Sequence, residues 1–400
     1  MYSVASRAAF ESTDDRRTGR HTALDLILGC AASPFTAEHA VRLDHLVRED
    51  FDWDEVTALA ESQGLVPLAY KCLASLPDVP ACALEKLRAR AERNARQALW
   101  LTQLLHRITT AFEQRGIAAL PYKGPVLAEL LYHNVSMRQY SDLDILVRSA
   151  DLPRARNVLE ELGFTAALPL TPRQERADMA SGYECVFDAP GTKNVVELQW
   201  RILPRFYAIN FDVEGLFDRA RPLLVGGKTI QTLSNEDSLL VLCAHAAKHS
   251  WANISWVRDI AELDQSTELD WDSVISTAGQ LGIRRIVGIS FLLANQLLGA
   301  PPPSAVQRFV EQDSHIPALT KRVSATLELG TEPDVESLGY FRLMCDIREN
   351  RADKLRFGTR LALTPTISEW SLLQLPAIMF PLYGAIRIGR LVGKLMRRRQ

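Results

Sequence analysis

The chain has 400 residues, of which 47% are hydrophobic and 24% are charged, a composition that allows a substantial buried core. Lysine and arginine total 46 against 48 aspartate and glutamate residues, so the chain has no overall positive field that would recruit nucleic acid or an anionic membrane. We therefore expect no sequence-specific nucleic-acid binding, and any anionic ligand must be held by local groups.

Residues 1–22 are polar and lack the apolar region of a signal peptide, which predicts a disordered leader and no export. The six cysteines show neither C-x-x-C spacing nor a disulfide framework. Because such a pattern is typical of a reducing cytosol, we expect a cytoplasmic protein.

Three regions follow the leader. Residues 23–117 repeat apolar side chains at intervals of three and four, which predicts helices. In residues 118–230, strand-like runs (IAALPY, LDILV, YECVFD and NVVELQW) alternate with helical segments, which predicts a core with a small mixed sheet. Residues 231–400 are again mainly helical. The predicted fold class is α+β, with the sheet flanked by N-terminal and C-terminal helical regions.

The stretch PYKGPVLAELL begins the first helix of this core. Pro125 suits the first helical turn, and Gly124 allows close approach of the backbone. The free N–H groups of a helix start favour an anion, and Lys123 adds a positive charge beside them. The pattern favours a phosphate site here, and a plain turn into a core helix is the alternative.

The run SDLDILV places two aspartates in an apolar strand. Because side chains alternate along a strand, Asp142 and Asp144 project from one face and the apolar residues between and after them from the other. Two carboxylates this close repel each other, and Mg²⁺ is the hard cation that carboxylates and phosphates commonly hold together. The pattern predicts a magnesium site, with a solvated strand end as the alternative.

A third carboxylate occurs in NVVELQW. Glu197 faces away from Val196 and Leu198, and a carboxylate buried in an apolar strand is costly without a partner. Beside the aspartate pair it would complete a metal site, as ligand of a second metal or as the base for an acceptor hydroxyl. Glu184 and Asp188 in YECVFD are rivals for this role.

The most apolar stretch lies near the C-terminus. Pro376, Pro381 and Arg387 interrupt it, whereas a membrane span needs about 20 largely uninterrupted apolar residues. We expect no membrane span but a buried segment with a solvated basic tail, and weak surface attachment through a basic amphipathic helix is the alternative.

Several short motifs occur together over roughly residues 50–265: Lys123-Gly124, Leu131-Tyr132, Arg138, the run SDLDILV at 141–147, Leu162-Gly163-Phe164, and Glu197 with Trp200-Arg201. As a set they resemble the uncharacterised nucleotidyltransferase family of the polymerase β-type superfamily. The resemblance implies transfer of a nucleoside monophosphate from a nucleoside triphosphate to an acceptor, assisted by two divalent metals. The acceptor, a small molecule, a peptide or a protein, stays open.

The resemblance also implies roles for single residues. Asp142 and Asp144 would hold Mg²⁺, or Mn²⁺ in its place, with Glu197 as the third carboxylate. Asp259 would line the same cleft, unless it forms a solvated pair with Arg258. The residues that would contact the nucleotide are Lys123, Gly124, Ser141, Lys248, His249 and Trp256. For the helical residues of this set, a packed helical hairpin is the alternative.

Gln199 stands where this family is expected to have a histidine. A catalytically silent nucleotide-binding module that acts through partners therefore stays open as a second function. A third is a metal-dependent phosphohydrolase, which would use the same carboxylates with water as the acceptor.

Overall fold

The computed structural model describes residues 22–168, 171–328, 337–364, 383–387 and 389. The predicted leader, apart from Thr22, and most of the C-terminal apolar stretch with its basic tail lie outside the described residues. The fold class is α+β as predicted, with many helices around one small mixed sheet. The division of the chain into four regions stays a prediction.

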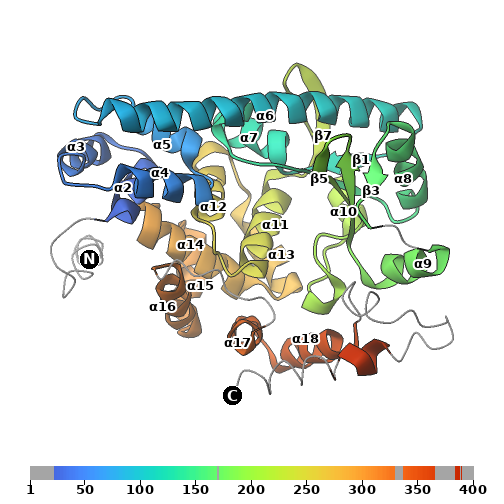
Figure 1. Cartoon of the computed structure of the whole chain (residues 1–400). Coiled ribbons are helices and arrows are strands. Elements are labelled where there is room, and N and C mark those ends of the chain that lie inside the picture. Colours follow the sequence, from blue (N-terminus) through green and yellow to red (C-terminus); the bar gives the residue numbers. More distant parts are fainter. Residues whose placement is uncertain (1–21, 169–170, 329–336, 365–382, 388, 390–400) are drawn as a thin grey trace.

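From residue 22 to the first strand, the structure describes the helices α2 (Ala23–Cys30), α3 (Ala37–Leu46), α4 (Trp53–Ser62), α5 (Val66–Leu73) and α6 (Ala81–Gln114). The 34 residues of α6 span about 50 Å at the usual helical rise, and the helix runs along one side of the whole molecule (Figure 1). Its first half packs in one hydrophobic cluster through Ala83 and Leu87, and its second half packs in another through Leu101, Leu105 and Phe112. The two hydrophobic clusters therefore share one helix.

The sheet has five strands in the order β1-β2-β5-β4-β3. Their bounds are β1 (Ala119–Pro121), β2 (Leu143–Val147), β3 (Thr165–Ala166), β4 (Glu184–Ala189) and β5 (Thr192–Gln199). The pair β2 and β5 is parallel, and the other neighbours are antiparallel. The four predicted strand-like runs correspond to β1, β2, β4 and β5, so these predictions are confirmed.

The connecting elements are α7 (Gly124–Tyr132), η1 (Val135–Met137), α8 (Leu152–Glu161), α9 (Pro172–Ser181), η2 (Arg205–Tyr207) and α10 (Val213–Asp218). A separate hairpin follows, formed by β6 (Arg221–Val225) and β7 (Lys228–Thr232). Gly226 and Gly227 form its turn, both with positive φ, which matches the backbone twist that tight hairpins require.

The two faces of the sheet differ in polarity. On one face, Ile145 and Val147 of β2 and Leu198 of β5 pack with the second half of α6 and with α8. The other face carries Asp144 and is turned toward the start of α7. The predicted alternation along β2 is therefore confirmed.

The helices after the hairpin are α11 (Asn235–Lys248), α12 (Ile254–Ser266), α13 (Trp271–Leu281), α14 (Arg284–Leu298), α15 (Ser304–Gln312), α16 (His315–Glu328), α17 (Leu338–Asp346) and α18 (Arg351–Leu363). The Ser234 side chain caps α11 by accepting the N–H of Asp237 at 3.1 Å. Buried residues of these helices and of α2 to α5 belong to one hydrophobic cluster. The N-terminal and C-terminal helices thus pack together beside the sheet (Figure 1).

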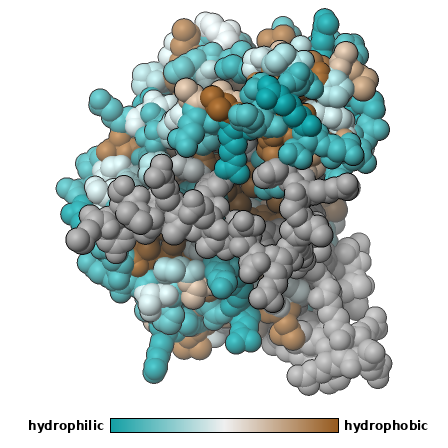
Figure 2. Space-filling view, turned by 90° about the vertical axis from the view of Figure 1, so that its left-hand side faces the viewer, coloured by the Kyte–Doolittle hydropathy of each residue, from teal (hydrophilic) through white to brown (hydrophobic). Residues whose placement is uncertain are grey.

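The described surface is mainly hydrophilic where it is seen in Figure 2, with apolar residues in small groups. In the part of the chain that the structure describes, no helix combines the length and the apolar character that a membrane crossing requires.

Candidate functional site

Asp144 and Glu197 lie side by side on neighbouring strands. The register of the parallel pair β2 and β5 places Asp144 directly opposite Glu197, and residues paired in this way project from the same face of a sheet. Asp144 is only 3% exposed, and Glu197 is half-buried. The structure thus brings together two of the three carboxylates predicted for the site.

The Lys123-Gly124 turn lies against the start of β2. Gly124 has a φ of +54°, and a Cβ atom at this position would lie 3.0 Å from the backbone carbonyl oxygen of Asp142. Both facts favour a glycine, because any other residue would be strained at this φ and crowded against the carbonyl. Pro125 lies in the first turn of α7, as predicted. The half-buried Asp142, just before β2, is therefore next to the predicted phosphate-binding turn.

Lys123 is paired with the buried aspartate. Its Nζ donates to Asp144 Oδ1 at 2.8 Å, and the two side chains are 11% and 3% exposed. Burial alone would lower the pKa of Lys123, but the Asp144 carboxylate raises it above its ordinary value. The ammonium group therefore stays charged inside the site.

Gln199 is a member of the site that the sequence interpretation did not assign to it. Its Nε2 donates to Asp144 Oδ1 at 3.1 Å, to Glu197 Oε2 at 3.2 Å and to Glu184 Oε2 at 3.5 Å. The hydroxyl of Tyr122 donates to its Oε1. The signal was present in the sequence, because residue 199 faces the same side of the strand as residue 197.

The two rivals of Glu197 lie in different places. Glu184 is opposite Gln199 in the register of β4 and β5, so it joins the carboxylate group. Asp188 forms an ion pair with Lys193 Nζ at 2.7 Å. Glu184 is therefore a further carboxylate beside Asp144 and Glu197.

Burial and mutual repulsion raise the pKa of two of these carboxylates. Burial raises the pKa of Glu197 to about 8, and the negative charges of Asp144 and Glu184 add to the effect. Burial and Asp144 also raise the pKa of Asp142. Such a cluster favours a cation, and its oxygen donors are those that Mg²⁺ prefers, so the donor set fits this metal chemically. Among the described residues, no three His, Cys, Asp or Glu side chains form a ready-made metal site.

Two further predicted nucleotide contacts lie at the edge of this group. Ser141 is exposed in the loop before Asp142. Lys248, at the end of α11, donates to the Tyr183 hydroxyl at 2.9 Å, and burial lowers its pKa. The negative charges of Glu184, Glu197 and Asp144 act on Lys248, so Lys248 lies close to these carboxylates.

His249 and Trp256 pack against each other between α11 and α12. Their ring centroids are 5.1 Å apart, and the His245 ring lies 5.1 Å from Trp256 and 4.9 Å from His249. Burial lowers the pKa of His249 to about 3, so its imidazole is neutral at physiological pH. The arrangement matches the packed helical hairpin, and contact of these rings with a nucleotide stays a prediction.

The alternative that Arg258 and Asp259 form a solvated pair is wrong. Asp259 is 1% exposed and accepts a hydrogen bond from Arg138 Nε at 2.8 Å. Arg258 donates to Glu262 instead. The local sequence suggested a neighbour pair, but adjacent helical residues point in different directions, and each side chain finds its partner elsewhere.

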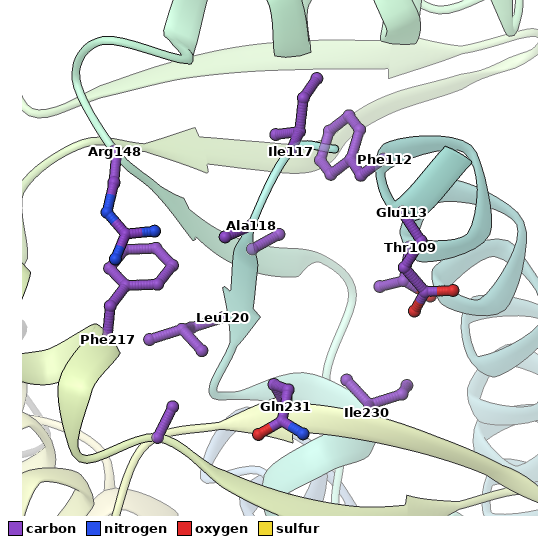
Figure 3. A pocket seen from close by; sticks show the side chains of 12 residues that line it. Thr109, Phe112, Glu113, Ile117, Ala118, Leu120, Arg148, Phe217, Ile230 and Gln231 are labelled. Atoms are coloured by element: carbon purple, nitrogen blue, oxygen red, sulfur yellow. The ribbon is translucent and has the colours of Figure 1, made fainter. Parts of the chain in front are cut away.

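A cavity of about 370 Å³ lies at the opposite end of β2 (Figure 3). The guanidinium of Arg148 is 4.1 Å from the ring centroid of Phe217 at its wall. Ala119, another lining residue, pairs with Val147, whereas the carboxylates lie near the start of β2. None of the predicted site residues lines this cavity, so it is separate from the carboxylates.

Comparison with known proteins and protein families shows what the chain is similar to. No curated protein matches the chain. A solved structure, of an antigenic nucleotidyltransferase-like protein from Paracoccidioides brasiliensis, is 15% identical, and the match covers 52% of this chain and 96% of that one with a TM-score of 0.30. A likeness this low supports no further conclusion. The family described as uncharacterised nucleotidyltransferase matches residues 49–299, more than half of the chain. The predicted resemblance is therefore confirmed, and the chain belongs to the uncharacterised nucleotidyltransferase family.

Proposed function

We propose that the protein transfers a nucleoside monophosphate from a nucleoside triphosphate to an acceptor, with Mg²⁺ as the cofactor. The observation that carries the proposal is the pairing of Asp144 with Glu197 on parallel strands, with the Lys123 ammonium 2.8 Å from Asp144. A group of carboxylates beside a buried cation is the arrangement that phosphoryl chemistry needs, because it can hold both a metal and phosphate oxygens.

Asp142 and Asp144 would hold the metal, which stabilises charge on the attacking and leaving oxygens when it is bound. Glu197 would be the third carboxylate, either as a second-metal ligand or as the group that takes the proton of the acceptor hydroxyl. Lys123 and the amides near Gly124 would bind triphosphate oxygens.

The remaining nucleotide contacts would come from the rim of the site: Ser141, Lys248, His249 and Trp256. The acceptor is a small molecule, a peptide or a protein side chain, since nothing in the carboxylate group selects what attacks the phosphorus. From the cysteine pattern we further infer that the protein acts in the cytoplasm.

A second candidate is a catalytically silent nucleotide-binding module. It is favoured by one observation: Asp144 Oδ1 already accepts hydrogen bonds from both Lys123 Nζ and Gln199 Nε2. In that case the two donors would replace the metal and the site would bind a nucleotide without transferring it.

The experiment incubates the purified protein with α-³²P-labelled triphosphates, Mg²⁺ and a host extract. We expect a labelled adduct that is lost in Asp142→Asn and retained in Asp78→Asn, a matched change at an exposed aspartate paired with Arg48. Hydrolysis of the triphosphate without an adduct would indicate a phosphohydrolase. Binding without adduct or hydrolysis would indicate the silent module.

A further inference from the structure

The carboxamide of Gln199 is the centre of the polar network. The residue is 2% exposed, and β5 directs it to the same face as Glu197. Its neighbours in register are Leu146 on β2 and Glu184 on β4. One NH₂ group therefore meets carboxylate oxygens from three strands, at 3.1 Å, 3.2 Å and 3.5 Å.

Tyr122 fixes which way the carboxamide points. A glutamine amide can present either its oxygen or its NH₂ group to a partner. The Tyr122 hydroxyl, in a side chain only 4% exposed, donates to Oε1. Because Oε1 is held by this donor, the NH₂ group must face the carboxylates.

The neutral amide suits a cation site. Two N–H donors offset part of the repulsion between the carboxylates without adding a positive charge that would compete with a metal. We propose that Gln199 is a positioning residue, which holds the carboxylates of Asp144, Glu197 and Glu184 together for a divalent cation. In this arrangement Tyr122 orients Gln199. The inference rests on the proposed function, because it assumes that the carboxylates bind a metal.

The test measures binding of Mn²⁺ alone, by electron paramagnetic resonance of the free ion, so that it does not depend on any acceptor. Loss of a group that orients metal ligands typically weakens metal binding by about 10-fold to 100-fold. We expect Gln199→Leu to weaken Mn²⁺ binding by about 10-fold or more, and Tyr122→Phe to weaken it in the same direction by a smaller factor.

The two residues act as a unit, so their effects should not add. Once Gln199 is replaced, Tyr122→Phe should cause no further loss. Tyr140→Phe is the matched control, because it also removes a hydroxyl, one that donates to the Val135 carbonyl at 3.0 Å and does not contact Gln199. It should bind Mn²⁺ as the unaltered protein does.

Unchanged Mn²⁺ binding in Gln199→Leu overturns the inference, as does a full additional loss in the double variant or an absence of Mn²⁺ binding in the unaltered protein. If Gln199→Leu does not fold, as judged by thermal melting, Tyr122→Phe decides, since it removes a single oxygen atom. Mn²⁺ binding with the expected losses but without nucleotide transfer would leave this inference standing and overturn the proposed function. Nucleotide transfer by the unaltered protein, combined with unchanged Mn²⁺ binding in Gln199→Leu, would overturn this inference and leave the proposed function standing.

Discussion

Arg138 Nε lies 2.8 Å from Asp259 Oδ2, although 121 residues separate the two in the sequence. The side chains are 8% and 1% exposed, and Tyr132 also donates to Asp259, at 3.4 Å. Arg138 belongs to the segment that leads from α7 to Asp142, whereas Asp259 belongs to α12. The ion pair therefore fastens the loop before the carboxylate site to the C-terminal helices.

Replacing one partner of this pair should be strongly destabilising. Asp259→Ala leaves the Arg138 charge buried without a partner, and we expect the free energy of unfolding to fall by about 3–5 kcal/mol. Chemical denaturation measures it. Glu92→Ala is the control, because Glu92 pairs with Arg88 at the surface, where the side chains are 51% and 57% exposed, and should cost at most about 1 kcal/mol. Equal losses of unfolding free energy in the two variants would contradict a buried ion pair between Arg138 and Asp259.

The two aspartates should respond differently to neutralisation. Asp142→Asn and Asp144→Asn should both abolish nucleotide transfer, because each removes a proposed metal ligand. Asp142→Asn should keep the melting temperature or raise it, since one of two neighbouring negative charges is lost. Asp144→Asn should lower it, because the buried Lys123 loses its charged partner. Transfer that survives either change would show that the metal assignment is wrong.

Lys123→Ala should change metal binding and triphosphate binding in opposite directions. Without nucleotide, loss of a positive charge next to Asp144 should tighten Mn²⁺ binding, whereas triphosphate binding should weaken by about 10-fold, or roughly 1.4 kcal/mol. Titration calorimetry measures both constants. Lys228→Ala removes a lysine that pairs with Glu113 and serves as the control. An unaltered triphosphate affinity in Lys123→Ala would move the phosphate contact to another group, such as Lys248.

Asp264 on α12 provides a pH test away from the carboxylate site. Burial raises its pKa from 3.8 to about 6. Between these values the folded state keeps a proton that the unfolded state has lost, so the stability of the protein falls as the pH rises and stays low above the folded pKa. Asp264→Asn should match the unaltered protein at pH 4 and be more stable at pH 7, by about 1 kcal/mol after allowance for partial exposure. Denaturation curves at the two pH values measure the difference, and an equal stability at pH 7 would contradict it.

The strand positions and the side of the strand that carries each carboxylate could be predicted from the sequence, because alternation is a local property. The close approach of Gly124 to the Asp142 carbonyl could not, since the two residues are eighteen positions apart and only the return of the chain brings them together. Gln199 was missed as a site residue for a chemical reason. A neutral amide is not a metal ligand of the kind that the carboxylate pattern predicts, and its hydrogen bonds to three carboxylates appear only when the strands are placed side by side.

Asp259 illustrates the same limit for charges. Its sequence neighbour Arg258 suggested a surface pair, whereas the true partner lies in another part of the chain. Burial reverses the expected energetics, because a solvated pair contributes little and a buried pair is costly to break.

The long helix α6 has a practical consequence for dissecting the molecule. Its second half supplies Leu101, Leu105 and Phe112 to the layer beneath the sheet, while its first half supplies Leu87 to the neighbouring helical body. A fragment that starts at residue 118 would lack α6, so it would expose the apolar face of the sheet to water and tend to aggregate. We therefore expect that the sheet and the helices that follow it do not fold as a separate fragment, and that heat or denaturant melts both hydrophobic clusters in one cooperative step.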